Sequence, residues 1–201
     1  MNVVRAKPFQ RISVADYLSR EILSPRRHEF VAGQVYEMPD TRNLHNIITG
    51  NVLGAIHPRV KASGCRPFES NTKIRIRLPT DIRFYYPDVS VICRQNSPHE
   101  YFHDNPVAIF EVLSRSTRRI DGGEKKDACL TIPSLTVYAL VEQESAMVVV
   151  HRRTEQGFVP EVYEGLSAVI PLPEIETELP LADIYDGVEF TPEPREAFDA
   201  I

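Results

Sequence analysis

The segments that decide the fold are FYYPDVSVIC at residues 84–93, PVAIFEVLS at residues 106–114 and RRIDGGEKK at residues 118–126. The first two are rich in β-branched and aromatic residues and predict buried strands. Each nevertheless contains one carboxylate, Asp88 in the first and Glu111 in the second. An ionised carboxylate is costly to bury unless a cation, a metal or several hydrogen-bond donors compensate it. Two such residues on successive strands, followed by Lys125 and Lys126, indicate a shared acidic site beside a cation.

The composition is that of a soluble globular protein, with 42% hydrophobic and 25% charged residues. A chain of 201 residues fits a single domain, with a core at about 14–188 and an acidic tail at 189–201. The first residues lack the apolar core of a signal peptide, and no window approaches membrane-spanning length. The cysteines Cys65, Cys93 and Cys129 are odd in number and form no CxxC pair. We therefore expect a cytoplasmic protein with reduced thiols.

Hydrophobic periodicity and turn residues predict the elements around this stretch. They are a helix over 14–23 capped by Ser13, a hairpin over 28–38 turning at Ala32-Gly33, a helix over 41–63 that Pro58 kinks or ends, strands over 72–78, 84–93, 107–113, 135–142, 147–153 and 157–163, a short helix carrying Lys125 that Asp121 or a preceding Thr caps, and a helical turn at 181–185. Along the 107–113 strand, alternation puts Ile109, Glu111 and Leu113 on one face. This order of elements predicts a mixed sheet flanked by helices.

A row of cations lies on the strand TKIRIRL at residues 72–78, although the net charge of the chain is −5. Strict alternation directs Lys73, Arg75 and Arg77 to the face opposite the aliphatic residues. That face could contact phosphates, or it could be the solvated face of an antiparallel sheet. His45 is likewise either a substrate-binding residue, an exposed polar residue or a local hydrogen-bonding partner.

The two carboxylates suit a hard divalent cation, because Mg²⁺ and Mn²⁺ prefer carboxylate, carbonyl and water oxygens. Hydrolysis of a phosphodiester requires neutralising a charged phosphate and generating a nucleophile from water. A nearby lysine could orient or deprotonate that water and stabilise developing charge.

Several pieces of the chain resemble one bacterial family, called "putative restriction endonuclease" and formerly a domain of unknown function, in the PD-(D/E)XK nuclease superfamily. The resembling pieces are HEFVAGQVYEM, LHNIITGNVL, YYPDVSVIC, FEVLS, DGGEKKDACLTIPSLTVYALVE and LPLADIYDGV, which together cover about residues 14–188. The resemblance implies an α/β (α+β mixed) fold with a restriction-endonuclease-like core, an extra N-terminal hairpin and C-terminal β additions.

The resemblance also implies roles for individual residues. Asp88, Glu111 and the backbone carbonyl of Val112 would hold Mg²⁺ or Mn²⁺. Leu113 stands where the simplest motif of the superfamily has its lysine. The family's alternative position, on the following helix, matches Lys125.

Other positions follow the family pattern less closely. Lys126 is the less favoured neighbour of the matched lysine. Glu29 matches the family's glutamate in the first hairpin and would join the acidic cluster. Gln34 stands where many relatives carry an acid, and Cys129 stands where many carry tyrosine.

The function implied is metal-dependent endonucleolytic hydrolysis of DNA, by a homodimer because cutting a duplex requires two sites. Arg115, Arg118 and Arg119 either bind phosphates or simply belong to a polar loop. Two alternatives stay open. One is an inactive module of the same fold that binds nucleic acid or protein, and the other is a carboxylate pair that hydrolyses another substrate, such as a glycoside.

Overall fold

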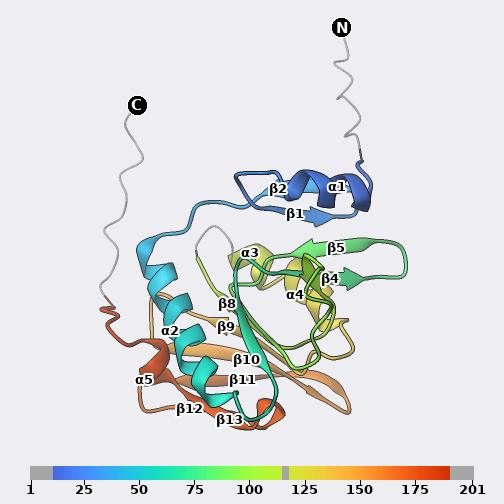
Figure 1. Cartoon of the computed structure of the whole chain (residues 1–201). Coiled ribbons are helices and arrows are strands. Elements are labelled where there is room, and N and C mark those ends of the chain that lie inside the picture. The colour runs from blue at the N-terminus through green and yellow to red at the C-terminus, as the bar shows by residue number, and fades with distance from the viewer. Residues whose placement is uncertain (1–10, 115–117, 191–201) are drawn as a thin grey trace, which may run out of the picture.

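A computed structural model describes residues 11–114 and 118–190 (Figure 1). The helices are α1 (Val14–Glu21), α2 (Asn43–Arg59), α3 (Arg118–Asp121), α4 (Glu124–Leu130) and α5 (Leu181–Ile184), with a 3-10 turn η1 (Pro173–Ile175). The strands are β1 (His28–Val31), β2 (Gln34–Glu37), β3 (Arg66–Glu69), β4 (Lys73–Arg77), β5 (Ile82–Tyr85), β6 (Val89–Ile92), β7 (Phe102–His103), β8 (Pro106–Val112), β9 (Val137–Val141), β10 (Met147–Thr154), β11 (Gly157–Glu164), β12 (Val169–Leu172) and β13 (Thr177–Pro180). The mixed α/β fold with its N-terminal hairpin and C-terminal strands confirms the predicted class.

The central sheet has six strands in the order β11-β10-β9-β8-β6-β3. Its β8–β9 pair is parallel and its other pairs are antiparallel. The parallel pair needs a crossover, which α3 and α4 supply. One face packs on α2, α5 and the β12–β13 ribbon, and the other packs on α4, β4 and β5. Alternation therefore decides which side chains of β8 face α4, and Ile109 and Leu113 do so as predicted.

The second sheet has five strands in the order β2-β1-β5-β4-β7 and forms the upper layer of Figure 1. Helix α1 packs on it through Tyr17, which contacts Phe30 and Phe84. The segment 84–93, predicted as one strand, is instead two strands in two different sheets, because β5 ends at Tyr85 and β6 begins at Val89. A proline at position 87 lies in this break, where it has no N–H to donate to a strand ladder.

The N-terminal elements follow local chemistry closely. The Ser13 hydroxyl accepts a hydrogen bond from the Asp16 amide at 3.1 Å and caps α1 as predicted. Ala32 and Gly33 both have positive φ, 50° and 86°, which suits the tight turn of the β1–β2 hairpin. Helix α2 ends at Arg59, one residue after Pro58. At α4 the prediction is wrong, because the cap position is Gly123 and no side chain caps the helix.

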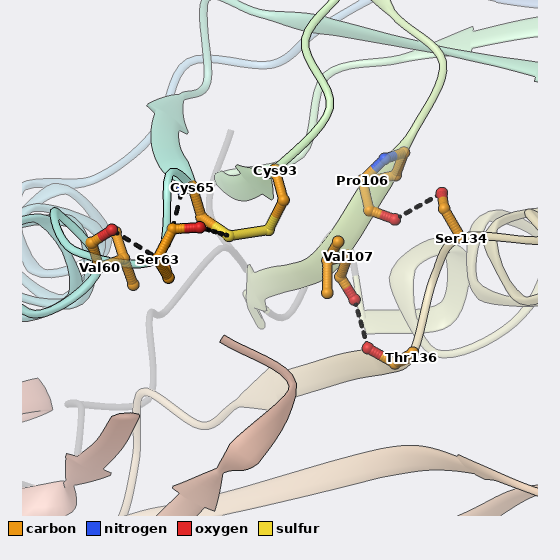
Figure 2. Close-up of a disulfide and its surroundings, with 8 residues drawn as sticks. All are labelled: Val60, Ser63, Cys65, Cys93, Pro106, Val107, Ser134 and Thr136. Carbon is orange, nitrogen blue, oxygen red and sulfur yellow. Dashed lines mark hydrogen bonds between the residues drawn. A yellow bond between two sulfur atoms is a disulfide. The ribbon is translucent and has the colours of Figure 1, made fainter. Parts of the chain in front are cut away.

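The cysteines also differ from the prediction. Cys65 and Cys93 form a disulfide (Figure 2), so the expectation of three reduced thiols is wrong. The physical reason is strand register: β3 pairs with β6 so that Arg66 lies opposite Ile92, and the two cysteines lie one residue beyond this pair. Their separation of 28 residues gave no sign of this proximity. Cys129 is free and buried.

Two further points concern the ends and the surface. Among residues 11–114 and 118–190, no helix is long and apolar enough to cross a membrane. The acidic tail predicted at 189–201 lies almost entirely outside the described residues.

Candidate active site

Asp88 and Glu111 lie next to each other at one end of the central sheet. Strands β6 and β8 are antiparallel with Val89 opposite Phe110. Asp88 precedes Val89 and Glu111 follows Phe110, so the register brings Asp88 and Glu111 together. The Val112 amide donates to Asp88 Oδ2 at 2.8 Å, and the Asp88 amide donates to Glu111 Oε2 at 3.4 Å. Both side chains belong to buried residues, 9% and 1% exposed. The strand break therefore puts two carboxylates at one buried point.

Lys125 supplies the cation at this point. It lies in the first turn of α4, and its side chain is 4% exposed. Its Nζ lies 2.9 Å from Glu111 Oε1 and 3.4 Å from Glu29 Oε1. It also donates to the Tyr86 carbonyl at 3.3 Å. Lys126 contacts only the exposed Asp127, at 4.0 Å, among the salt bridges of the described chain, so Lys125 is the lysine that faces the acids.

Asp121 is a member of the site that the sequence interpretation treated only as a possible helix cap. It is 5% exposed, and its Oδ1 lies 3.5 Å from Lys125 Nζ. The Tyr138 hydroxyl donates to its backbone carbonyl at 2.9 Å and fixes the end of α3. The available signal was its place only four residues before Lys125, although Asp121 ends α3 and Lys125 lies in the first turn of α4. We define the acid cluster as Glu29, Asp88, Glu111 and Asp121.

His45 of α2 also reaches the acid cluster, through Asp88. It is 7% exposed, and its Nε2 lies 3.1 Å from Asp88 Oδ2. The Thr49 hydroxyl lies 3.4 Å from its Nδ1. Burial lowers the pKa of His45, but the hydrogen bond and charge of Asp88, together with Asn46 and Asp121, outweigh burial, and the pKa stands above its ordinary value. The alternative of an exposed histidine is therefore wrong.

Negative charge exceeds positive charge in this site. Burial raises the pKa of Glu111 well above its ordinary value, Asp121 and Asp88 raise it further, and Lys125 opposes them. Burial acts to lower the pKa of Lys125, but Glu111, Glu29 and Asp121 together outweigh it, so the pKa is raised and the amine stays protonated. One ammonium thus compensates several carboxylates.

The acid cluster opens into a cavity of about 350 Å³. Its floor is the acid cluster with His45 and Lys125, and its walls come from the hairpin, the segment that leads to α2, β5 and α3. The other lining residues are Val31, Tyr36, Glu37, Met38, Pro39, Thr41, Tyr85, Tyr86, Ile120 and Glu124. A volume near 350 Å³ is at the lower end of the range of small-ligand sites.

The sequence matches one protein family over most of its length. The profile of the family described as "Putative restriction endonuclease" (Uma2) matches residues 14–182. The chain belongs to this family. All four members of the acid cluster, Lys125 and His45 fall within the matched range.

Two curated proteins and one solved structure are also similar to this chain. The Synechocystis sp. (strain ATCC 27184 / PCC 6803 / Kazusa) protein slr1290, uncharacterized, is 26% identical over 184 residues, which cover 91% of this chain and 96% of that protein. A second uncharacterized protein from that strain, sll1609, is 28% identical over 135 residues, 66% of this chain and 75% of that protein. A crystal structure of a "putative nuclease belonging to DUF820" from Anabaena variabilis ATCC 29413 has a TM-score of 0.69 at 20% identity, covering 89% of this chain and 99% of that one. At that identity the likeness establishes the fold.

The cations on β4 do not line the cavity of the acid cluster. Lys73 is 6% exposed and donates to the Tyr86 hydroxyl at 3.1 Å. Arg75 makes two hydrogen bonds of 2.7 Å to Asp104. Arg77 is exposed, and none of the three cations lines the described cavity. Only Arg77 of the three is exposed, so the three side chains do not form one common solvated row.

The loop arginines are only partly described. Arg115 lies outside the described residues, and so does the side chain of Arg119. Arg118 pairs with both carboxylate oxygens of Glu142, at 2.5 Å each. Its role in the described chain is thus to join α3 to the end of β9.

The donors at the site fit a hard divalent cation. Across residues 11–114 and 118–190, no three side chains of His, Cys, Asp or Glu group closely enough to hold a metal ion by themselves. A set of two carboxylates completed by a backbone carbonyl and water remains, and Mg²⁺ commonly binds through one or two carboxylates while keeping several waters. Glu111 Oε1 is buried, and the Lys125 ammonium lies 2.9 Å from it. That one ammonium is shared with Glu29 and Asp121, so the carboxylates of the acid cluster outnumber it, and this excess of acids favours an added cation.

Proposed function

We propose that this protein is a Mg²⁺- or Mn²⁺-dependent endonuclease that hydrolyses phosphodiester bonds in DNA. The observation that carries the proposal is the buried pair of Asp88 and Glu111, joined through the Val112 and Asp88 amides and contacted by the Lys125 ammonium. Membership of the restriction-endonuclease family supports the same reaction class.

Asp88, Glu111 and the Val112 carbonyl are the proposed metal ligands. When bound, a divalent ion supplies neutralisation of phosphate charge and a more acidic water. His45 holds Asp88 through the 3.1 Å contact to Oδ2, and so fixes the orientation of one proposed ligand.

Lys125 is the proposed positioning and charge-stabilising group for the attacking water and the scissile phosphate. The ammonium donates hydrogen bonds, and its Nζ lies 2.9 Å from Glu111 Oε1, beside the proposed metal ligands. We therefore assign Lys125 to orienting water and stabilising developing negative charge. Glu29, whose Oε1 lies 3.4 Å from Lys125 Nζ, helps to hold the ammonium in place.

A homodimer completes the proposal for a duplex substrate. Each chain carries one acid cluster, so cutting both strands in one encounter requires two chains. Exposed Arg77, which does not line the cavity, is a further proposed phosphate contact. Arg115 is proposed as another from the sequence alone.

The test is nicking of supercoiled DNA by wild type and by Asp88→Asn, with and without Mg²⁺ or Mn²⁺. The control is Glu178→Gln, which removes an exposed carboxylate of β13 far from the cavity lining. We expect metal-dependent nicking by wild type and by the control, and a loss of at least about 100-fold in Asp88→Asn. DNA binding without turnover in any metal, unchanged in Asp88→Asn, would instead indicate an inactive binding module.

A further inference from the structure

The β1–β2 hairpin places an aromatic ring directly beside the acid cluster. In the register of the hairpin, Glu29 lies opposite Tyr36. Directly opposed residues of an antiparallel pair project to the same face, with Cβ atoms about 5 Å apart. Glu29 reaches Lys125 Nζ at 3.4 Å, so Tyr36 stands one cross-strand step from the proposed site of hydrolysis.

The ring of Tyr36 is not used by the fold. The residue is 50% exposed, although tyrosine carries a large apolar surface. It lines the active-site cavity and also a second cavity of about 480 Å³ between α1 and the hairpin. Its hydroxyl contacts only the neighbouring Gln34 among the described hydrogen bonds. Its exposed surface is therefore available to a ligand.

Further apolar surface continues the wall on which Tyr36 lies. Val31, Met38 and Pro39 line the cavity on the hairpin side, and Ile120 of α3, 43% exposed, lines it from another element. Apolar groups around a few polar ones are typical of sites that take a small organic group. Hydrolysis of a phosphodiester does not itself need such a wall.

The charges of the cavity also favour an apolar or aromatic ligand group. Lys125 is the only lysine or arginine that lines it within the described chain, and its ammonium is already shared among Glu111, Glu29 and Asp121. The wall also carries Glu37 and Glu124, whose carboxylates already pair with Arg26 and Arg83, two cations that do not line the cavity. Beyond a bound metal, this cavity offers little attraction to a second phosphate, so its contribution to substrate binding must come from its apolar and aromatic surface.

We infer that the cavity takes an unpaired nucleotide whose base stacks on Tyr36, so that single-stranded or locally unpaired DNA is the preferred substrate. This inference rests on the proposed nuclease function and names the substrate class of the same site. Stacking on an aromatic ring tolerates every base, because each base has a π face. A fully paired base stays inside the duplex and reaches such a pocket only after it is flipped out of the stack.

The test is binding of a short single-stranded oligonucleotide that carries 2-aminopurine, compared with its fully paired duplex, with Ca²⁺ as the divalent ion. We expect wild type to bind the single strand more tightly and to quench its fluorescence. Tyr36→Ala should weaken single-strand binding by about 5- to 150-fold and abolish the quenching. Tyr36→Phe keeps the ring and should keep both. Tyr101→Ala removes a tyrosine that is 59% exposed and does not line the cavity, and it should match wild type.

Equal affinity for the single strand and the duplex, or unchanged quenching in Tyr36→Ala, would overturn the inference. If supercoiled DNA is nicked equally by wild type and Tyr36→Ala in that case, the proposed nuclease function stands and only the substrate class is wrong. If neither nicking nor DNA binding occurs, both proposals are wrong.

Discussion

Replacing Lys125 by methionine tests the buried charges of the site most sharply. The Lys125 side chain is 4% exposed, and its Nζ lies 2.9, 3.4 and 3.5 Å from oxygens of Glu111, Glu29 and Asp121. Methionine keeps most of the aliphatic length and removes the ammonium. The carboxylates then remain buried without their counter-charge, which is the costly way to break a buried ion pair.

The expected loss in the free energy of unfolding is about 3–5 kcal/mol at pH 7 without divalent metal. For a chain of this size each kcal/mol lowers Tm by about 2–4 °C, so Tm should fall by roughly 6–20 °C. Urea denaturation and thermal melting both measure this. The adjacent Lys126→Met is the matched control, because its partner Asp127 is 76% exposed and lies at 4.0 Å, and it should change stability by no more than about 1 kcal/mol.

The dependence on pH gives a second measurement of the same effect. Burial raises the pKa of Glu111, with Asp121 and Asp88 adding to it. A carboxyl whose pKa is raised on folding stabilises the native state below its unfolded pKa of about 4.3, and that stability is lost as pH rises through the folded pKa. The deficit of Lys125→Met should therefore shrink on acidification toward pH 4.5. Equal effects of the two lysine substitutions at pH 7 would refute the reasoning.

Three further predictions concern the disulfide, the role of His45 and one ion pair of the second sheet. Cys65→Ser, or reduction, should lower the free energy of unfolding by about 2–4 kcal/mol in urea denaturation, because the disulfide closes a loop of 28 residues. His45→Ala should weaken Mn²⁺ binding about 10- to 100-fold by calorimetry, and exposed His57→Ala should not. Burial acts to raise the pKa of Asp104, but hydrogen bonds, led by that from Arg75, hold this pKa below its usual range. Arg75→Met should therefore lower the free energy of unfolding by about 1–3 kcal/mol at pH 7 in urea denaturation, and this loss should shrink below a pH of about 4.

Local chemistry explains why much of the fold was predictable. The period of two along β8 decided that Glu111 shares a face with Ile109 and Leu113, since a strand cannot turn one side chain independently of its neighbours. The cap at Ser13 and the turn at Gly33 likewise depend on residues within a few positions of each other.

Contacts between distant segments explain what was missed. His45 lies 43 residues before Asp88, and no spacing rule connects a helix to the residue before a strand. Lys73 and Arg75 likewise bond to residues from other segments, Tyr86 and Asp104. Alternation along one strand predicts which side chains share a face, but it does not show what packs against that face. The break between β5 and β6 has a visible cause in Pro87. The prediction of one strand over 84–93 gave more weight to the apolar residues than to this proline.

The most direct test of the central claim is a Mn²⁺ titration of the protein followed by electron paramagnetic resonance. Wild type and Glu178→Gln should bind the ion with equal affinity, and Asp88→Asn and Glu111→Gln should each bind it at least about 10-fold more weakly. Equal Mn²⁺ affinity in all four proteins would show that this carboxylate pair does not hold the metal, and would contradict the account.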